Sequence, residues 1–440
     1  MRKDRFKEWC FIFFLGFFIF SYEFFLFDSV MLTYMVKAAC PLILLLIWPT
    51  YRLHYIRGQV LLFYGVFWFL IFISCLTSGQ SDSLTQFFKY LLKFSIVPII
   101  FFKLAPGRLS DRYIKFLIPF GFLFAVQSII LFLLIFYDVP LKSSVRVIDP
   151  SMGFEFISYG WLGYANARQY TGEDFILRAQ SWFGEPSNFC QFMAFPTVIS
   201  YGYYVLTRKI RFLFYFLVCA AGMLITFSFG GFISVSGALL ITGIYSFFMK
   251  RLKLRSYLIR AVLLLAILGG GLSFVERVII PGADQIYHSD IPAQFKKVMG
   301  RSMENPQSQL IRQSAQADLI FETIKKNFLG VGLAHTYGQS KLTSPNAFLF
   351  WLVAGGLPAA LALLWLYFFL FIRVILPALE RRMHIVRYLA IVFMINTIHG
   401  LSVGFWMTPY YLYILAMMII FYDTPPSSSL TSQGLIRSAE

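Results

Sequence analysis

Long apolar runs constrain the fold of this chain more than any other feature. A helix needs about 20 apolar residues to cross the hydrocarbon core of a membrane. Runs near that length lie at 9–26, 29–48, 59–77, 84–103, 113–136, 187–206, 212–228, 230–249, 257–275, 346–372, 387–404 and 407–422. Only 13% of the residues are charged, whereas a soluble domain averages about 25%. The sequence therefore predicts an all-α polytopic membrane protein with about 12 transmembrane helices.

The basic residues predict how these helices are oriented. An even number of spans puts both chain ends on one side of the membrane, and short cytoplasmic loops carry an excess of Lys and Arg. Basic clusters at 2–7, 52–57, 208–211, 250–255 and 381–387 all fall on the side of the two ends. We therefore expect cytoplasmic N- and C-termini. The net charge of +17 then reflects topology and contacts with membrane lipids, and no nucleic-acid partner is expected.

This topology predicts a single transmembrane domain over 1–422 and a disordered cytoplasmic tail over 423–440. Two connections are long, 137–186 and 276–345, and both are expected on the outer face. Within the second loop, apolar positions between Ser308 and Phe328 recur at three- and four-residue steps, which indicates an amphipathic helix. A Gly330-Val331-Gly332 turn follows it. The Gly355-Gly356 pair inside span 346–372 predicts a kink or a close helix contact.

The stretch from Arg178 to Phe189, R-A-Q-S-W-F-G-E-P-S-N-F, places an arginine and a carboxylate just before an apolar span. Charged groups at a membrane edge are costly unless they are paired or used. Arg178 offers a planar fork of donors suited to phosphate, and Glu185 can take a proton from a hydroxyl group. The same two residues could equally form a structural salt bridge between loop and helix, and both interpretations stay open.

Four further residues are candidates for the same chemistry, and each has a simpler interpretation. Arg312 lies on the polar side of the amphipathic segment, where it could reach a phosphate or simply face water. His335 follows the glycine turn and could act as acid or base or lie on the surface. Lys89 and Lys93, four residues apart, share one helix face and could attract a lipid-linked phosphate or extend to the headgroups.

Metal and nucleotide cofactors are not expected. The five histidines show no H-E-x-x-H or similar spacing, so we predict no metal site, and no P-loop sequence is present. The five cysteines lie in or beside apolar runs and are expected to be packing residues.

The R-x-x-x-x-x-G-E-P-S-x-F run from Arg178 to Phe189 resembles the signature of Wzy-type polysaccharide polymerases, which belong to the O-antigen ligase superfamily. Several other features agree with that family: the span number with both ends inside, a second outer loop with Arg312 before a G-x-G turn, and a span that begins at Asn346 and contains Gly355-Gly356. One position departs from it. Ligases and many relatives carry a histidine directly before the asparagine, where this chain has Pro345.

The resemblance implies a multi-span glycosyltransferase C-type fold in a bacterial cytoplasmic (inner) membrane. It implies a polymerase that joins undecaprenyl-diphosphate-linked oligosaccharide repeat units at the outer face, without metal or nucleotide. Arg178 and Arg312 would hold the diphosphate with help from Lys89 and Lys93. Glu185, or alternatively His335, would be catalytic, and Asn346 would have a positioning role. A chain-length regulator protein is a candidate partner.

Two other functions remain open at this stage. A ligase on the same frame would transfer finished polysaccharide to another acceptor. A flippase or transporter of lipid-linked sugars would instead line a central cavity with charged groups deep in the spans. Three residues keep the transport interpretation open: Lys89, Lys93, and His399 inside span 387–404. The product, whether O-antigen, capsule or exopolysaccharide, is not specified by the sequence.

Overall fold

The computed structural model is built mainly of helices. It describes residues 2–23, 39–46, 53, 55–104, 112–137, 139, 144–149, 154–159, 164–169, 175–181, 183, 186–226, 228–248, 325, 327–333, 347–381, 384–402 and 408–423. The named helices are α1 (Arg2–Glu23), α3 (Tyr55–Thr77), α4 (Ser81–Phe94), α5 (Ile96–Lys103), α6 (Arg112–Lys115), α7 (Leu117–Phe136), α8 (Pro186–Thr207), α9 (Ile210–Leu224), α10 (Phe229–Phe248), α15 (Ala347–Leu370), α16 (Leu376–Glu380), α17 (Ile385–Ser402) and α18 (Pro409–Asp423), with a π-helical turn, η5 (Phe371–Ile375), between α15 and α16.

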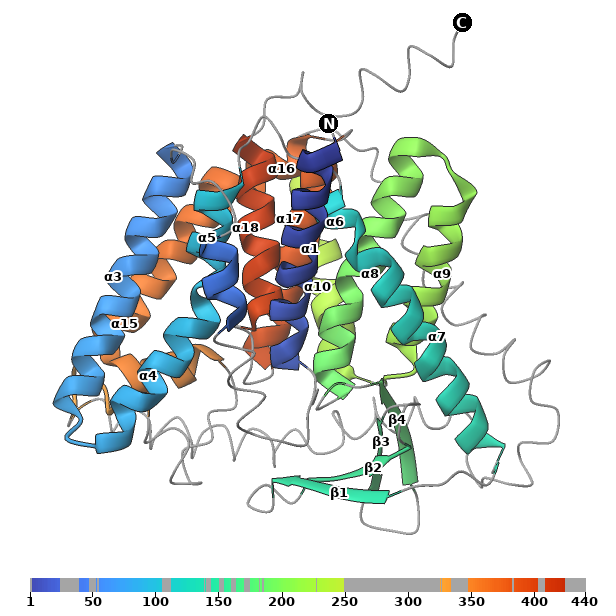
Figure 1. Cartoon of the computed structure of the whole chain (residues 1–440), viewed down its shortest axis with the longest axis horizontal. Helices are drawn as coiled ribbons and strands as arrows, with labels where there is room; N and C mark the ends of the chain where they lie inside the picture. Colours follow the sequence, from blue (N-terminus) through green and yellow to red (C-terminus); the bar gives the residue numbers. More distant parts are fainter. Residues whose placement is uncertain are drawn as a thin grey trace, which may run out of the picture.

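The helices stand side by side in one bundle, with α3, α4 and α15 on one flank, α7 and α9 on the other, and α17 and α18 between them (Figure 1). Each predicted span coincides with a described helix, except that 29–48 is described only over 39–46, where it is helical, and 257–275 lies outside the described residues. Four described stretches are long and apolar enough to cross a membrane: Tyr55–Thr77, Asp82–Lys103, Arg112–Leu134 and Phe348–Glu380. The helical class and the membrane-spanning length of these helices are thus confirmed.

A four-stranded antiparallel sheet adds to the helical bundle and was not predicted. Its strands β1 (Ser144–Asp149), β2 (Phe154–Ser158), β3 (Tyr164–Gln169) and β4 (Phe175–Ser181) pair in chain order. They lie in the segment expected as the first outer loop, so the fold is helical with a small sheet rather than purely α. The strand β4 packs against α7 and α8, and the sheet lies beneath one end of the bundle (Figure 1). We call this end the sheet end.

Pro98, Pro196 and Pro358 each leave a backbone carbonyl group without its usual partner, because a proline cannot donate to the carbonyl four residues earlier. In each case a hydroxyl group from another helix donates to that carbonyl. Tyr64 donates to Phe94 O at 2.8 Å, opposite Pro98. Opposite Pro196, Tyr410 donates to Phe192 O at 2.8 Å. Opposite Pro358, Ser74 donates to Ala354 O at 2.5 Å. Such pairing is required where no water can satisfy a carbonyl group.

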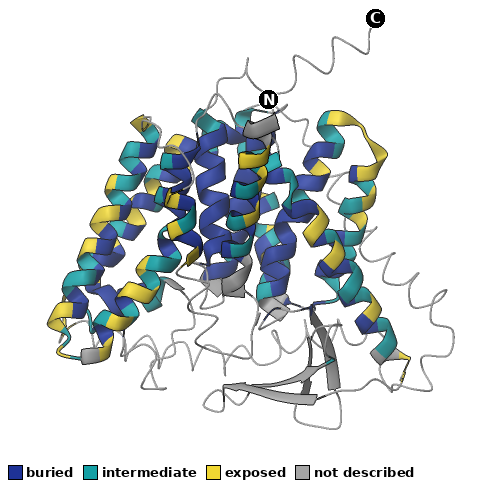
Figure 2. Cartoon of the chain, viewed as in Figure 1, coloured by how far each residue is buried: buried dark blue, intermediate teal, exposed yellow. Residues whose placement is uncertain are grey.

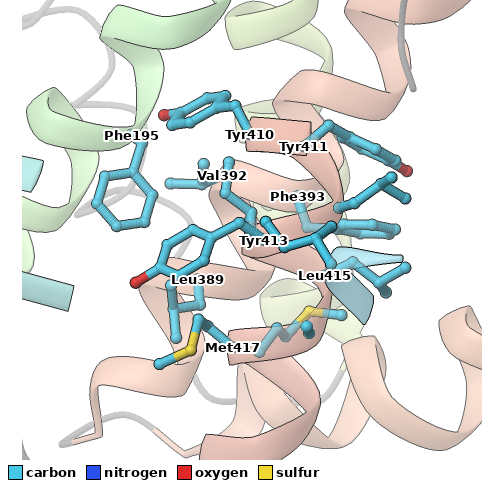
Figure 3. Packing of buried hydrophobic residues seen from close by; sticks show 14 of the residues in the cluster. Phe195, Leu389, Val392, Phe393, Tyr410, Tyr411, Tyr413, Leu415 and Met417 are labelled. Atoms are coloured by element: carbon cyan, nitrogen blue, oxygen red, sulfur yellow. The ribbon is translucent and has the colours of Figure 1, made fainter. Parts of the chain in front are cut away.

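The core is densest around α18, where every residue from Pro409 to Phe421 is buried, while the flanking helices expose apolar side chains on their outward faces (Figure 2). At the centre of the bundle, Phe195 of α8 faces side chains from α17 and α18 (Figure 3). They are Leu389 and Val392 of α17, and Tyr410 and Tyr413 of α18. The outward residues include Phe69 and Trp365, which are 61% and 57% exposed. This distribution suits a bundle surrounded by lipid.

The end of the bundle opposite the sheet is rich in basic residues, and we call it the basic end. Arg57 of α3 is fully buried there, donates to Leu104 O at 2.8 Å and lies 3.3 Å from the Asp423 carboxylate. Arg112 pairs with Glu8 at 2.7 Å. The start of α1 and the end of α18 both lie at this end (Figure 1). The bundle therefore has two chemically different ends.

Candidate functional site

Only some of the predicted site residues lie within the described structure. Arg178 lies on β4, directly before the chain enters α8. Glu185, Arg312, His335 and Asn346 lie outside the described residues, so their predicted roles stay predictions. The amphipathic segment 308–328 is likewise outside them, apart from Lys325 and the turn from Asn327 onward.

The register of the sheet adds two arginines that the sequence pattern did not single out. Arg178 of β4 pairs with Asn166 of β3, and Arg168 pairs with Ile176. Residues directly opposite each other, and residues two apart on one strand, share a face of the sheet. Arg168 and Arg178 are therefore on the same face.

The same rule extends across the other two strands. Ile157 of β2 pairs with Ala165, so Phe156 is level with Asn166 and shares its face. Arg146 of β1 pairs with Phe156. The register thus places Arg146, Arg168 and Arg178, from three strands, on one face of the sheet. No sequence spacing could reveal this, because the relation exists only once the strands pair.

The two predicted lysines lie on a different flank of the bundle. Lys89 is exposed on α4, and the Lys93 ammonium group lies 5.8 Å from the centre of the Tyr90 ring. Figure 1 shows α4 on the flank formed with α3 and α15, whereas β4 lies beneath α7 and α8. The structure therefore does not bring Lys89 and Lys93 beside the strand that carries Arg178.

The predicted kink in span 346–372 is confirmed. The turn Gly330-Val331-Gly332 of the second loop packs against α15 at this kink. The backbone of Gly356 has φ of 70°, which interrupts α15. Two groups freed by this break bond to the turn: Val331 N donates to Val353 O at 3.0 Å, and Leu357 N donates to Phe328 O at 3.1 Å. The segment 327–333 therefore supplies hydrogen bonds to α15 that a continuous helical turn would otherwise make within the helix.

Glycine is required on both sides of this junction. Gly330 has φ of 88°, a region that L residues rarely adopt, and a Cβ atom there would collide with the backbone nitrogen of Gly356. Ser74 of α3 ties the parts together, since it accepts from Gly332 N at 3.1 Å and donates to Ala354 O. The junction fixes the point from which the chain continues toward His335.

Buried polar groups lie on α8 and α17 near the same end. Gln191 and His399 are 4% and 1% exposed. At the edge of β4, Ser181 donates to the side-chain oxygen of Gln127 in α7 at 2.7 Å. Within the described ranges, no group of three His, Cys, Asp or Glu side chains could hold a metal ion.

Comparison with known proteins does not identify a family. No protein-family model, no curated protein and no solved structure matches this chain.

Proposed function

We propose that this chain is a glycosyltransferase of the polysaccharide-polymerase type, which joins undecaprenyl-diphosphate-linked repeat units at the outer face of a bacterial cytoplasmic membrane. The single observation that best supports the proposal is the face of the sheet that carries Arg146, Arg168 and Arg178. Arginine is suited to bidentate recognition of phosphate. Three arginines on one small sheet, at the end where α8 begins, are a fitting receptor for a diphosphate at the membrane surface.

The proposed reaction needs few chemical groups. The acceptor hydroxyl oxygen attacks the anomeric carbon of the donor glycan, and the bond from that carbon to the diphosphate oxygen breaks. The electron pair of that bond leaves with the lipid diphosphate, where the arginines, including Arg312, stabilise the developing charge. Glu185, which precedes α8 by one residue, takes the hydroxyl proton. The diphosphate is already a good leaving group, so nucleotide and metal are not required.

The proposal can be tested with purified protein in lipid nanodiscs and lipid-linked repeat units as the only substrate. We expect polymer from the wild type and none from Arg178→Ala or Glu185→Ala. Arg211→Ala is a matched control, because Arg211 is exposed at the opposite, basic end. Arg178→Lys keeps the charge but loses the planar fork, so it should restore only part of the activity. Full polymer formation by Arg178→Ala and Glu185→Ala would refute the assignment.

Transport of lipid-linked sugars is the second candidate, because Gln191, Asn396 and His399 are buried polar groups within helices of the bundle. Polymer formation in the nanodisc assay would exclude transport as the sole function. A ligase is distinguished in cells. Loss of a polymerase leaves single repeat units on the final carrier, whereas loss of a ligase leaves long chains on the lipid diphosphate.

A further inference from the structure

The buried polar side chains of α8 and α17 form a second feature of the sheet end that the proposed reaction does not use. Gln191 is 4% exposed, and its Nε2 has no hydrogen-bond partner among the residues that the structure describes. One turn earlier, the Oδ1 of Asn188 is buried and lacks a partner within the same part of the chain. Buried polar groups are normally paired, so unpaired groups need an explanation.

The contact between α8 and α17 defines which residues lie opposite each other. The ring of Tyr388 packs directly on Gly202, and the two helices run in opposite directions (Figure 1). Gln191 precedes Gly202 by 202 − 191 = 11 residues, and His399 follows Tyr388 by 399 − 388 = 11 residues. Equal steps along antiparallel helices lead toward the same end of the bundle and to similar levels.

The same steps also lead to the same side of each helix. At 3.6 residues per turn, eleven residues complete three turns with a remainder of about 20°. Gly202 and Tyr388 face each other, so Gln191 faces α17 and His399 faces α8. Asn188 is three residues from Gln191 and lies on the same side of α8.

The contacts with α10 measure how far apart Gln191 and His399 lie along the bundle axis. Cys190 meets Gly231, and Ile398 meets Gly237, which is 237 − 231 = 6 residues further along α10, or ~9 Å at ~1.5 Å per residue. Gln191 and His399 each lie one residue inside that interval. Their separation along the bundle axis is then ~6 Å, about one helical turn, which two long side chains can span through a bound group.

We infer that Asn188, Gln191 and His399 form a saccharide-binding subsite, which holds the acceptor sugar by its hydroxyl groups. Amide and imidazole groups both donate and accept hydrogen bonds, as a polyhydroxylated and uncharged ligand requires. These three residues lie near the sheet end of the bundle, because Gln191 is five residues from the start of α8 and His399 is three residues from the end of α17. The role as acceptor subsite rests on the proposed function, whereas the binding of a saccharide does not.

The alternative is that these groups only stabilise the bundle, and stability measurements distinguish the two. If the amide is purely structural, its hydrogen bonds stabilise the folded protein. Replacing it by an apolar side chain breaks these bonds and lowers the stability. An amide kept unpaired for a ligand costs stability in the free protein, so an apolar side chain of similar shape relieves that cost. Gln191→Met is the informative variant, and Gln59→Met, at a half-buried glutamine of α3 bonded to Tyr55, is its matched control.

The experiment uses the full chain in detergent and a panel of methyl glycosides of common bacterial sugars, with binding detected by saturation-transfer difference NMR. We expect the wild type to bind at least one glycoside. Gln191→Met and His399→Phe should bind it about tenfold more weakly, the factor that the loss of one good hydrogen bond produces, and Gln59→Met should bind normally. The thermal midpoint of Gln191→Met in the absence of sugar should equal or exceed that of the wild type.

Two results would overturn the inference: a wild type that binds no glycoside of the panel, or a Gln191→Met variant that binds as well as the wild type. A lowered thermal midpoint of Gln191→Met with unchanged binding would identify a structural group instead. The outcome is independent of polymer formation. If glycoside binding depends on Gln191 but no polymer forms in the nanodisc assay, the subsite stands and the polymerase proposal fails.

Discussion

At the scale of single residues, the junction between the segment 327–333 and α15 depends on the absence of a side chain. Gly330→Ala should destabilise the protein by at least about 1–3 kcal/mol from the positive φ alone, and the collision with Gly356 adds to this cost. Gly65→Ala is the control, since Gly65 lies in α3 with open space beside it. Alanine is favoured over glycine in a helix by about 1 kcal/mol, so the control should match or exceed wild-type stability. Thermal unfolding followed by tryptophan fluorescence measures both, and equal midpoints for the two variants would contradict the packing described for the junction.

The ion pair between Arg57 and Asp423 is the second residue-scale feature with a measurable consequence. Removal of one partner from a buried pair typically costs about 3–5 kcal/mol, because it leaves an uncompensated charge. Asp423→Asn should therefore lower the unfolding midpoint strongly, since Arg57 is fully buried. The double variant Arg57→Met/Asp423→Leu should recover much of the loss, because apolar replacement of both partners is often neutral. A double variant less stable than Asp423→Asn would show that the bonds from Arg57 to Leu104 O and Phe101 O matter more than the pair.

At the scale of elements, the hydroxyl groups opposite the prolines explain how interrupted helices remain compatible with a membrane. Tyr410→Phe removes the hydroxyl group that donates to Phe192 O and should cost about 1–3 kcal/mol. Pro196→Ala restores a backbone N–H that can bond to the same carbonyl. The tyrosine should then matter less in the Pro196→Ala background, and a double-mutant cycle measures this coupling. Additive effects of Tyr410→Phe and Pro196→Ala would exclude the compensation, and the pair Tyr64 and Pro98 offers an independent repeat.

The elements also show why some features were predictable and others were not. Apolar runs follow from the cost of exposing backbone groups to lipid, so the helix positions could be read from composition, and the Gly355-Gly356 pair correctly indicated the break at Gly356. The segment 144–181 gave no comparable signal, because its sheet depends on pairing between short strands of mixed composition. The shared face of Arg168 and Arg178 follows from that pairing alone. Gln191 could have been noticed as a polar residue three positions from Asn188 within an apolar run.

At the scale of the whole molecule, the two ends of the bundle differ in chemistry and in construction. The basic end is tied by ion pairs from Arg57 and Arg112. The sheet end combines the arginine face, the glycine junction and the polar layer between α8 and α17. The helices thus support a small sheet and the segment 327–333 at this end. A lipid-linked substrate would meet all three features at one membrane interface.

The proposed function requires the sheet end to face outward, and this orientation can be measured with single cysteines. Asp82 is exposed at the start of α4 on the sheet end, and Lys209 is exposed between α8 and α9 at the basic end. Cys40, Cys75, Cys190 and Cys219 are buried, so a Cys10→Ser background should show little labelling of its own. A membrane-impermeant maleimide should label Asp82→Cys in intact spheroplasts, and it should label Lys209→Cys only after permeabilisation. The reverse pattern would put the arginine face in the cytoplasm. It would contradict the proposed reaction, which joins the lipid-linked donor and acceptor at the outer face.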